Sequence, residues 1–432
     1  MRDTLGMKMA ASMTVDITSY CKKMAGRARS ASRQLANLST GVKDRWLLAC
    51  ADEIVSSPST ILDANQEDLA NAPQYGLSEA EVDRLRMDQK GIEALALALR
   101  EIAMLRDPVG ETIEGWVRPN GLEIRKVRVP LGTVFFIYES RPNVTVDAAA
   151  ICVKSGNAVI LRGGKEAIHS SLALVRMINQ VAAKYSIPDG AVQLVDTTDR
   201  AVVGHFLQLS HFIDVVIPRG GRELIERVTR EAQMPVIKHF DGNCHVYVDA
   251  TADLMMAEQV VINSKCQRMG VCNACESLLI HRSLSHHFLP RIAQQLLHHG
   301  IEIRGDSEVC RLVPEAVPGS EQDWAAEYLG PVISICIVDN LQAAIDHINR
   351  YGSHHTDAIV TRDLNSARQF QLQIDSSAVI VNASTRFNDG GQLGLGAEIG
   401  ISTDKLHARG PCGLRELTTY KYLIVGNGHT RS

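Results

Sequence analysis

The sequence lacks a dominant charge of either sign. Its 432 residues include 45 Lys and Arg against 49 Asp and Glu, which gives a formal net charge of −4. Nucleic acids attract strongly basic surfaces, so we expect no nucleic-acid partner. The sequence also lacks the run of about 18 apolar residues that a membrane helix requires, and residues 1–20 lack the apolar segment of a secretory signal. We therefore expect no membrane partner, and the role of residues 1–16 stays open.

The sequence has ten cysteines but no compact disulfide framework, because they are scattered along the chain. This distribution indicates reduced thiols and a cytoplasmic protein. Cys272 and Cys275 form a single CxxC pair without a second CxxC or a spaced pair of histidines, so we expect no metal site. From the residues alone, a buried thiol, a redox pair and a nucleophile all stay open. Lys265 and Arg268 add positive charge nearby, which favours a thiolate.

Short apolar segments alternate with helical segments over most of the chain. Such alternation is typical of α/β proteins with a mostly parallel sheet, and the length suffices for two or three domains. Helices are expected at 17–57, 90–105, 144–154, 165–185, 199–209 and 221–232. Strands are expected at 134–137, 158–161, 191–195, 214–217, 236–238, 245–249, 277–281, 301–303, 332–338, 357–361 and 378–382.

Segment 112–129 interrupts this alternation. Apolar and polar residues alternate on both sides of Asn120-Gly121, a dipeptide that tolerates the positive φ of a tight turn, so the segment is predicted to be a β-hairpin. Residues 382–412 are rich in Gly, Asn, Ser and Thr, and a loop of that length is usually functional. The last segment, 418–425, is predicted to be a strand.

Two glycine-rich turns follow predicted strands and open predicted helices. They are Arg162-Gly163-Gly164-Lys165 and Arg219-Gly220-Gly221. Glycines let a backbone approach a phosphate, a helix N-terminus favours an anion, and the basic side chains add charge. The turns therefore indicate a dinucleotide site, with an ordinary strand-to-helix turn as the alternative, because neither has the GxGxxG pattern.

Several long blocks of the sequence resemble one known family. They are Val129–Gly132, Tyr138-Glu139-Ser140-Arg141-Pro142-Asn143, Asn157–Glu166, Ile217–Gly221, Asn382–Phe387, Gly394–Glu398, Lys405–Pro411 and Thr418–Tyr422. In this order they are similar to blocks of the γ-glutamyl phosphate reductases (glutamate-5-semialdehyde dehydrogenases), which belong to the aldehyde dehydrogenase superfamily. The resemblance extends from Ile17 to the C-terminus.

The resemblance implies the NADPH-dependent reduction of L-glutamyl 5-phosphate to L-glutamate 5-semialdehyde and phosphate, the second step of proline biosynthesis from glutamate. It implies an α/β, aldehyde dehydrogenase-like fold. The expected parts are a Rossmann-type cofactor domain (17–111 and 130–244), an α/β catalytic domain (245–386), a β-hairpin oligomerisation arm (112–129 and 413–428) and a loop that returns between the domains (387–412). A homodimer or a dimer of dimers is expected, with glutamate kinase as a transient partner. The segment before Ile17 is too short for a kinase domain, so we expect the stand-alone form.

The resemblance assigns the nucleophile to Cys272 rather than Cys275. The thiolate attacks the acyl phosphate and forms a thioester, which splits one difficult displacement into two easier steps. The side-chain amide of Asn143 and the backbone N–H of Cys272 are implied to stabilise the oxyanion. Arginine suits bidentate contacts with the anionic groups of the substrate, and the candidates are Arg141, Arg268 and Arg386.

The implied cofactor is NADP(H). Relatives that prefer NAD place a glutamate against the adenosine ribose. Lys165 stands at that position here, where a cation pairs with the 2′-phosphate of NADP. Glu327 matches the segment that holds the nicotinamide ribose.

Two other functions stay open. A hydrolytic aldehyde dehydrogenase needs a base that activates water, but residues 238–242 lack the glutamate of the hydrolytic relatives. His239 and Asp241 are the remaining candidate bases in that stretch. A non-catalytic redox or metal-binding protein would use Cys272 and Cys275 as a dithiol or a metal clip.

Overall fold

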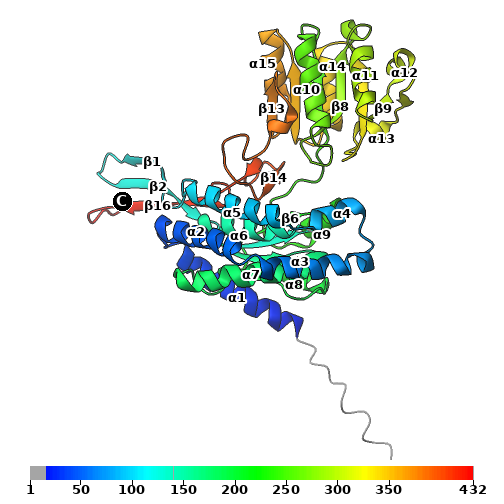
Figure 1. Ribbon diagram of the computed structural model, residues 1–432. Helices are drawn as coiled ribbons and strands as arrows, with labels where there is room; N and C mark the ends of the chain where they lie inside the picture. Colours follow the sequence, from blue (N-terminus) through cyan, green and yellow to red (C-terminus); the bar gives the residue numbers. More distant parts are fainter. Residues whose placement is uncertain (1–15, 140, 432) are drawn as a thin grey trace, which may run out of the picture. The chain divides into compact units, whose positions relative to one another are not determined.

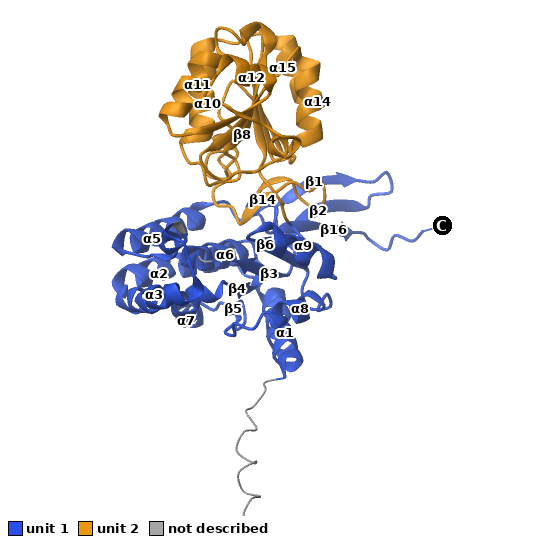
Figure 2. Cartoon of the chain, turned by 90° about the vertical axis from the view of Figure 1, so that its right-hand side faces the viewer, with its two compact units in different colours: residues 1–237, 413–432 blue, residues 238–412 orange. Residues whose placement is uncertain are grey.

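The computed structural model describes residues 16–139 and 141–431 (Figure 1). Ser140, which belongs to one of the blocks that carry the family resemblance, lies outside the described residues, and so do residues 1–15. The chain divides into two compact units (Figure 2). Unit 1 comprises residues 1–237 and 413–432, and unit 2 comprises residues 238–412.

Unit 1 contains a four-stranded parallel sheet in the order β5-β4-β3-β6. Its strands are short and buried: β3 (Thr133–Tyr138), β4 (Ala158–Arg162), β5 (Val192–Leu194) and β6 (Val215–Arg219). The helices are α1 (Ile17–Leu35), α2 (Thr40–Ser56), α3 (Ser59–Asn71), α4 (Glu79–Leu85), α5 (Gln89–Met104), α6 (Pro142–Lys154), α7 (Ile168–Lys184), α8 (Ala201–Leu207) and α9 (Arg222–Glu231). Strands that alternate with helices α6 to α9 confirm the predicted α/β class.

A three-stranded antiparallel sheet extends from unit 1. It consists of β1 (Thr112–Val117), β2 (Glu123–Pro130) and β16 (Thr418–Val425), in that order. Gly121 has a φ of +88° in the turn between β1 and β2, which explains why Asn-Gly marked this hairpin correctly. Strand β16 pairs with β2 along its whole length, so the predicted C-terminal strand belongs to the arm.

Unit 2 is built on a seven-stranded parallel sheet in the order β10-β9-β11-β8-β7-β12-β13. The strands are β7 (Cys244–Val248), β8 (Cys275–His281), β9 (Glu302–Gly305), β10 (Val317–Pro318), β11 (Val332–Val338), β12 (Thr356–Val360) and β13 (Ala378–Val381). The helices are α10 (Leu254–Cys266), α11 (Leu289–His298), α12 (Ser307–Leu312), α13 (Glu321–Trp324), α14 (Leu341–Tyr351) and α15 (Leu364–Gln373). Apolar residues of β7, β8 and β11 form its core with α10 and α11.

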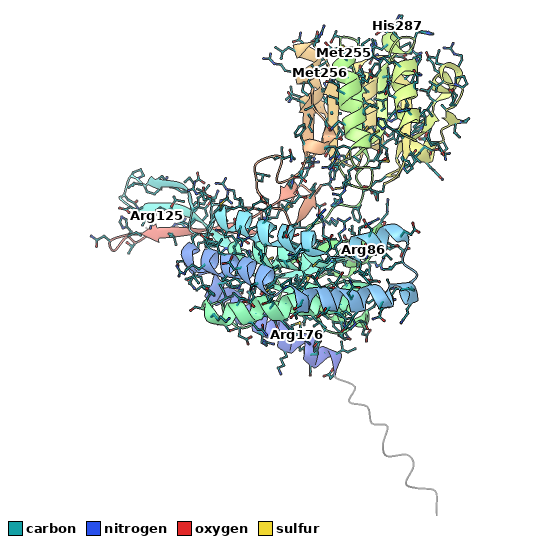
Figure 3. The ribbon with its side chains drawn as sticks, viewed as in Figure 1. Arg86, Arg125, Arg176, Met255, Met256 and His287 are labelled. Atoms are coloured by element: carbon teal, nitrogen blue, oxygen red, sulfur yellow. The ribbon has the colours of Figure 1, made fainter. Side chains whose placement is uncertain are left out.

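Helix α10 leads into the loop that carries Cys272. Its first turn is capped by Asp253, whose carboxylate accepts hydrogen bonds from the backbone N–H groups of Met255 and Met256 at 3.0 and 3.1 Å. The side chains of these two methionines are exposed at this end of the helix (Figure 3). The other end of α10, at Cys266, is followed directly by the loop that carries Cys272. The cap therefore fixes the start of the helix that precedes this loop.

Several segments differ from the sequence-based expectations. The helix expected at 17–57 is two helices, α1 and α2, with a break at residues 36–39. Residues 236–238 form only an isolated bridge between Val236 and Val216, because the carbonyl of Lys238 accepts from the N–H of Thr403 instead of continuing beside β6. Helix 165–185 begins as a separate 3₁₀ turn, η2 (Lys165–Ala167), before α7. The expected loop 387–412 contains a small antiparallel pair, β14 (Gly400–Ser402) and β15 (Gly410–Cys412).

The boundary between the units falls at residues 237/238, whereas the sequence suggested 244/245. Ile237 still donates a backbone hydrogen bond to Val216 of β6, at 3.0 Å. Lys238, in contrast, forms an ion pair with Asp404 at 2.8 Å, within unit 2. Residues 238–243 therefore belong with the sheet of unit 2. Within the described ranges, no helix is both long and apolar enough to cross a lipid bilayer.

Candidate active site

Cys272 lies in the loop between α10 and β8 and is partly exposed. Its backbone packs against the segment that leads into β7. A Cβ at Gly242 would lie 2.0 Å from the carbonyl oxygen of Cys272, so this close approach requires glycine. The thiol of Cys244 donates a hydrogen bond to the same carbonyl at 3.1 Å. The loop is thus held in place while the Cys272 side chain keeps access to solvent.

Cys275 has a different environment. It is the first residue of β8, is fully buried, and its thiol donates to the carbonyl of Ser277 at 3.3 Å. Burial raises the pKa of this thiol to about 12. A thiol of that kind is protonated at neutral pH and is inert as a nucleophile or metal ligand. The geometry therefore supports Cys272 over Cys275 as the reactive thiol.

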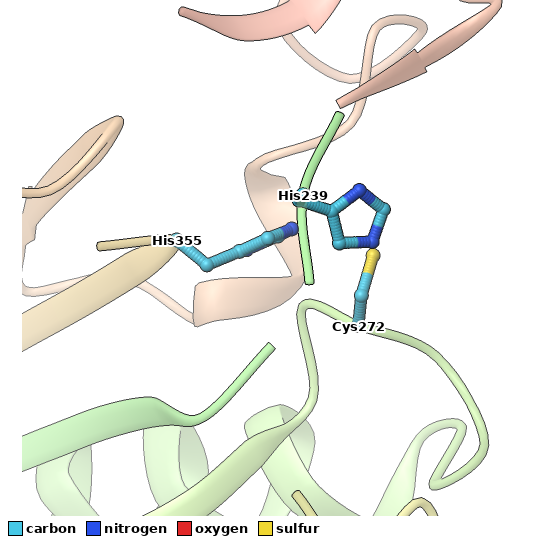
Figure 4. Close-up of side chains that lie close together, drawn as sticks. All are labelled: His239, Cys272 and His355. Carbon is cyan, nitrogen blue, oxygen red and sulfur yellow. The ribbon is translucent and has the colours of Figure 1, made fainter. Parts of the chain in front are cut away.

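Two imidazoles lie beside Cys272. The ligand atoms of His239, Cys272 and His355 all lie within 4.8 Å of one another (Figure 4). Because β8, β7 and β12 are neighbours in the parallel sheet, the residues that precede these three strands meet at its amino-terminal edge. Nδ1 of His239 lies 2.9 Å from the carbonyl oxygen of Ile401, and Nδ1 of His355 lies 2.7 Å from the hydroxyl of Thr356. These contacts orient the two rings beside the thiol.

The expected cationic groups near Cys272 behave in two ways. Lys265 forms a fully buried ion pair with Glu276 at 2.5 Å, and its predicted role of favouring the Cys272 thiolate stays a prediction. Arg386, in contrast, interacts electrostatically with both Arg268 and Cys272. Burial lowers the pKa of Arg386, an effect that Asp389 opposes and the neighbouring Arg268 reinforces. The structure thus brings Arg386 close to the thiol and Arg268 close to Arg386.

Arg386 also lines a pocket of about 270 Å³ in unit 2. Its guanidinium donates to the side-chain oxygen of Gln267 at 2.9 Å. The other lining residues are Asn263, Phe387, Asp389 and Gln392. The pocket therefore offers amide groups, a carboxylate and a guanidinium, which suits a small ligand that carries both an ammonium and a carboxylate.

Glu327 lies near the Cys272 loop. Burial raises its pKa to about 7, and the backbone N–H of Gly242 opposes this shift, while Asp241 and Glu276 add to it. Its contact with Gly242 places the carboxyl group next to the segment that supports Cys272. The predicted role of Glu327 with the nicotinamide ribose stays a prediction.

The predicted cofactor residues other than Glu327, which belongs to unit 2, gather at one edge of the sheet in unit 1. Strands β4, β3 and β6 are neighbours and parallel, so the residues that follow them meet at their carboxyl ends, the usual ligand edge of such sheets. Arg162 ends β4 and Arg219 ends β6. Burial lowers the pKa of Arg162, and the nearby Arg200 adds to the shift. An anion bound here would reduce the repulsion between the guanidinium groups of Arg162 and Arg200.

One glycine in each of the two turns is closely packed against a side chain. A Cβ at Gly163 would lie 3.1 Å from the ring of Tyr138, and one at Gly220 would lie 2.5 Å from the carboxylate of Glu139. Gly221 is the N-cap of α9, and its N–H donates to the same carboxylate at 3.1 Å. Gly164 precedes the η2 turn. The N-terminus of α9 thus binds the carboxylate of Glu139. Backbone N–H groups of this kind are also the donors that a phosphate would need.

Asn143 and Arg141 lie at the start of α6, directly after β3. Asn143 is exposed, and its side-chain amide donates to Asp147 at 3.3 Å. Burial raises the pKa of Asp147 to about 6, and the hydrogen bond from Asn143 opposes the shift. Arg141 precedes the helix in unit 1, whereas Arg268 and Arg386 belong to unit 2.

Sequence reasoning missed three residues near these sites: Cys244, His355 and Arg200. His355 stands beside His354, and nothing local marks either histidine as functional. Only the strand order of unit 2 brings His355 and Cys244 to Cys272. Arg200 follows β5, so a search for basic residues after every predicted strand would have found it.

Comparison with known proteins agrees with this architecture. The family model described as "Aldehyde dehydrogenase family" matches residues 8–309 and 312–399. The chain therefore belongs to the aldehyde dehydrogenase family, whose members use a nicotinamide cofactor.

Its similar proteins carry a more specific name. A gamma-glutamyl phosphate reductase of Rhodopirellula baltica is 62% identical over 416 residues, covering 96% of each chain. One of Caldanaerobacter subterraneus subsp. tengcongensis is 48% identical over 407 residues, covering 94% of this chain and 98% of that protein. The crystal structure of gamma-glutamyl phosphate reductase from Thermotoga maritima has a TM-score of 0.94 at 44% identity, covering 95% of this chain and 100% of that one. These similarities confirm the predicted resemblance to the γ-glutamyl phosphate reductases.

Proposed function

We propose that this protein reduces L-glutamyl 5-phosphate to L-glutamate 5-semialdehyde and phosphate with NADPH, in the biosynthesis of proline. The observation that carries the proposal is a partly exposed Cys272 beside two imidazoles and Arg386, in a chain 62% identical to a gamma-glutamyl phosphate reductase. A thiolate can attack the carbonyl carbon of an acyl phosphate. The phosphate is then a good leaving group, so a thioester forms.

His239 is the proposed base for the thiol. Its Nδ1 lies 2.9 Å from the Ile401 carbonyl, which favours the tautomer that donates from Nδ1 and leaves a lone pair on Nε2. That nitrogen takes the proton of Cys272 as the thiolate forms. The resulting imidazolium then stabilises the thiolate, as in other Cys–His pairs.

The thiolate attacks the acyl carbon, the bond between that carbon and the phosphate oxygen breaks, and a thioester remains on Cys272. The backbone N–H of Cys272 and the side-chain amide of Asn143 are the proposed donors to the oxyanion. Asp147 accepts one N–H of Asn143 at 3.3 Å, so the amide keeps a second N–H for the substrate. When the semialdehyde is released, the C–S bond breaks and the thiolate returns.

NADP(H) is the proposed cofactor, and it supplies the hydride that reduces the thioester. The proposed holding residues are Arg162, Gly163, Gly164, Lys165, Arg219, Gly220, Gly221 and Glu327. Lys165 and Arg162 favour the 2′-phosphate of NADP, since a carboxylate at position 165 would repel it. The neighbouring guanidinium of Arg200 supports this preference.

The substrate is proposed to bind through arginines. Arg268 and Arg386 lie near Cys272, where the phosphate and the carboxylate of the substrate need cationic partners. Arg141 is proposed as a third contact. The pocket beside Arg386 suits the amino-acid end of the substrate, because Asp389 can pair with its ammonium group.

The alternatives are less well supported. Residues 238–242 carry no glutamate that could activate water for hydrolysis, and His239 is proposed as the base for the thiol instead. A CxxC dithiol is disfavoured because Cys275 is fully buried and its pKa is raised to about 12.

A homodimer through the arm is part of the proposal. Trp116, Val117, Tyr422 and Ile424 of the arm sheet are exposed, and an apolar sheet of this kind favours association. A dimer of dimers, a transient glutamate kinase and a cytoplasmic location stay predictions.

The reverse reaction tests the proposal. Glutamate semialdehyde and NADP are supplied with and without phosphate, and formation of NADPH is followed by absorbance. We expect turnover that requires phosphate, is abolished by Cys272→Ala and is mostly retained in Cys275→Ala. Turnover that does not depend on phosphate would indicate a hydrolytic enzyme, and loss of activity in Cys275→Ala alone would overturn the choice of nucleophile.

A further inference from the structure

We propose that His239, Cys272 and His355 also form a binding site for a zinc ion, which blocks the nucleophile reversibly. The three side chains provide two nitrogens and one sulfur within 4.8 Å of one another (Figure 4). Imidazole and thiolate are the preferred ligands of zinc. The site is inferred from this geometry, and only its effect on turnover rests on the proposed function.

The spacing of the donors suits one ion after a small adjustment. Zinc binds imidazole nitrogen at about 2.0–2.1 Å and thiolate sulfur at about 2.3 Å, so the donors of a tetrahedral ion lie about 3.5 Å apart. The three donors lie within 4.8 Å of one another, so binding requires them to approach by about an ångström, and the partly exposed Cys272 side chain has room to rotate. Three protein ligands leave a fourth position for water, as in zinc sites that exchange their ligands.

The surroundings of both imidazoles are those of metal ligands. Histidines that bind a metal through one nitrogen usually hold a carbonyl, carboxylate or hydroxyl with the other. His239 contacts the Ile401 carbonyl through Nδ1, and His355 contacts the Thr356 hydroxyl through Nδ1. These contacts fix the orientation of the rings, and the ligand atoms of both rings lie within 4.8 Å of the Cys272 sulfur.

Nearby charge limits the affinity of the site. Arg386 and Arg268 lie near Cys272 and disfavour a divalent cation. When the ion binds, Cys272 loses its proton to solvent and becomes a thiolate. The negative charge of the thiolate offsets part of the repulsion between the arginines and the ion. We therefore expect a site that a chelator empties, and the bound ion prevents attack on an acyl phosphate while it occupies the sulfur.

Cobalt titration of the full chain, freed of metal by a chelator, tests the site without any catalysis. We expect one Co²⁺ per chain with a thiolate-to-cobalt charge-transfer band. The band disappears in Cys272→Ser and persists in Cys275→Ser, the matched control with a buried thiol. No band in the unmodified chain, or a band that persists in Cys272→Ser, would overturn the proposal.

Zinc affinity and thiol protection give independent measurements. His355→Gln should weaken Zn²⁺ binding at least about 10-fold, as expected for loss of a metal contact. Because His355 is fully buried and its variant can misfold, alkylation of the unmodified chain is the second readout. Zn²⁺ should slow alkylation of Cys272 but not of Cys310, another partly exposed thiol. Equal protection of both thiols contradicts the site.

A metal-binding chain without reductase activity would contradict only the proposed function, and an active chain without the cobalt band would contradict only this inference.

Discussion

Gly242 packs directly on the backbone of Cys272. A Cβ at position 242 would lie 2.0 Å from the Cys272 carbonyl oxygen and 2.7 Å from its Cα, distances that no real contact tolerates. The strand β7 begins two residues later, at Cys244, so the start of this strand fixes where the nucleophile stands. The position of the thiol is therefore determined by backbone packing as well as by its own loop.

Gly242→Ala should displace the Cys272 loop and lower kcat about 100-fold, because a displacement of about 1 Å at a reacting group has effects of that size. The matched control is Gly270→Ala in the same loop, whose Cβ would meet only the Leu329 carbonyl at an ordinary 3.7 Å. Steady-state kinetics of both variants measure the effect. Activity of Gly242→Ala within about twofold of the unmodified enzyme would show that the packing does not position the thiol.

Lys165 determines cofactor choice in this account. Its ammonium lies 4.5 Å above the ring of Tyr75, directly after the β4 turn. Lys165→Glu should lower the ratio of kcat/KM for NADP over NAD by about 10- to 100-fold, the range of a lost charge-assisted hydrogen bond. Lys184→Glu, the same charge change at the C-terminus of α7, should leave the ratio unchanged. An unchanged ratio in Lys165→Glu would sink the 2′-phosphate assignment.

Lys265 and Glu276 form a buried ion pair in unit 2. Both side chains are fully buried, and the backbone N–H of Leu329 also donates to Glu276, at 3.1 Å. Lys265→Met leaves the carboxylate without its ion partner and should lower the free energy of unfolding by about 3–5 kcal/mol. Adding Glu276→Gln to Lys265→Met should recover part of that loss. Urea unfolding measures both variants, and a double variant no more stable than Lys265→Met would contradict the pairing.

The same pair predicts a dependence on pH. Burial raises the pKa of Glu276 to about 7, and Lys265 opposes the shift. A carboxyl group with a raised folded-state pKa binds more protons when folded, so its contribution to stability is lost as pH rises through about 7. Without Lys265 the pKa rises further, so the destabilisation by Lys265→Met should be smaller at about pH 5 than at about pH 8. Equal losses at both pH values would show that Glu276 does not titrate in this range.

Much of the fold could be predicted from local patterns. Short apolar strands between helices gave the α/β class, and Asn120-Gly121 gave the hairpin, because a turn that needs positive φ selects such residues. The strand predicted at 236–238 was wrong, because an apolar segment does not show which strand, if any, its backbone will pair with. Their backbone leaves β6 after one bridge and turns to Thr403, far along the chain.

The site was only partly predictable. Family resemblance pointed to Cys272, and burial of Cys275 supplies a physical reason for that choice. The thiol and its two histidine partners precede β8, β7 and β12, which are adjacent in space but distant in sequence, so His355 carried no local signal. Lys265 was predicted to add positive charge near the thiol because the two residues are close in sequence. In the structure its ammonium forms a buried ion pair with Glu276.

The central claim is that Cys272 carries the acyl group and that phosphate removes it. Mass spectrometry tests this directly on protein incubated with glutamate semialdehyde and NADP in the absence of phosphate. We predict that the peptide containing Cys272 gains the mass of a glutamyl thioester and loses it when phosphate is added. An acyl group on Cys275, no acyl group at all, or loss at the same rate without phosphate would contradict the account.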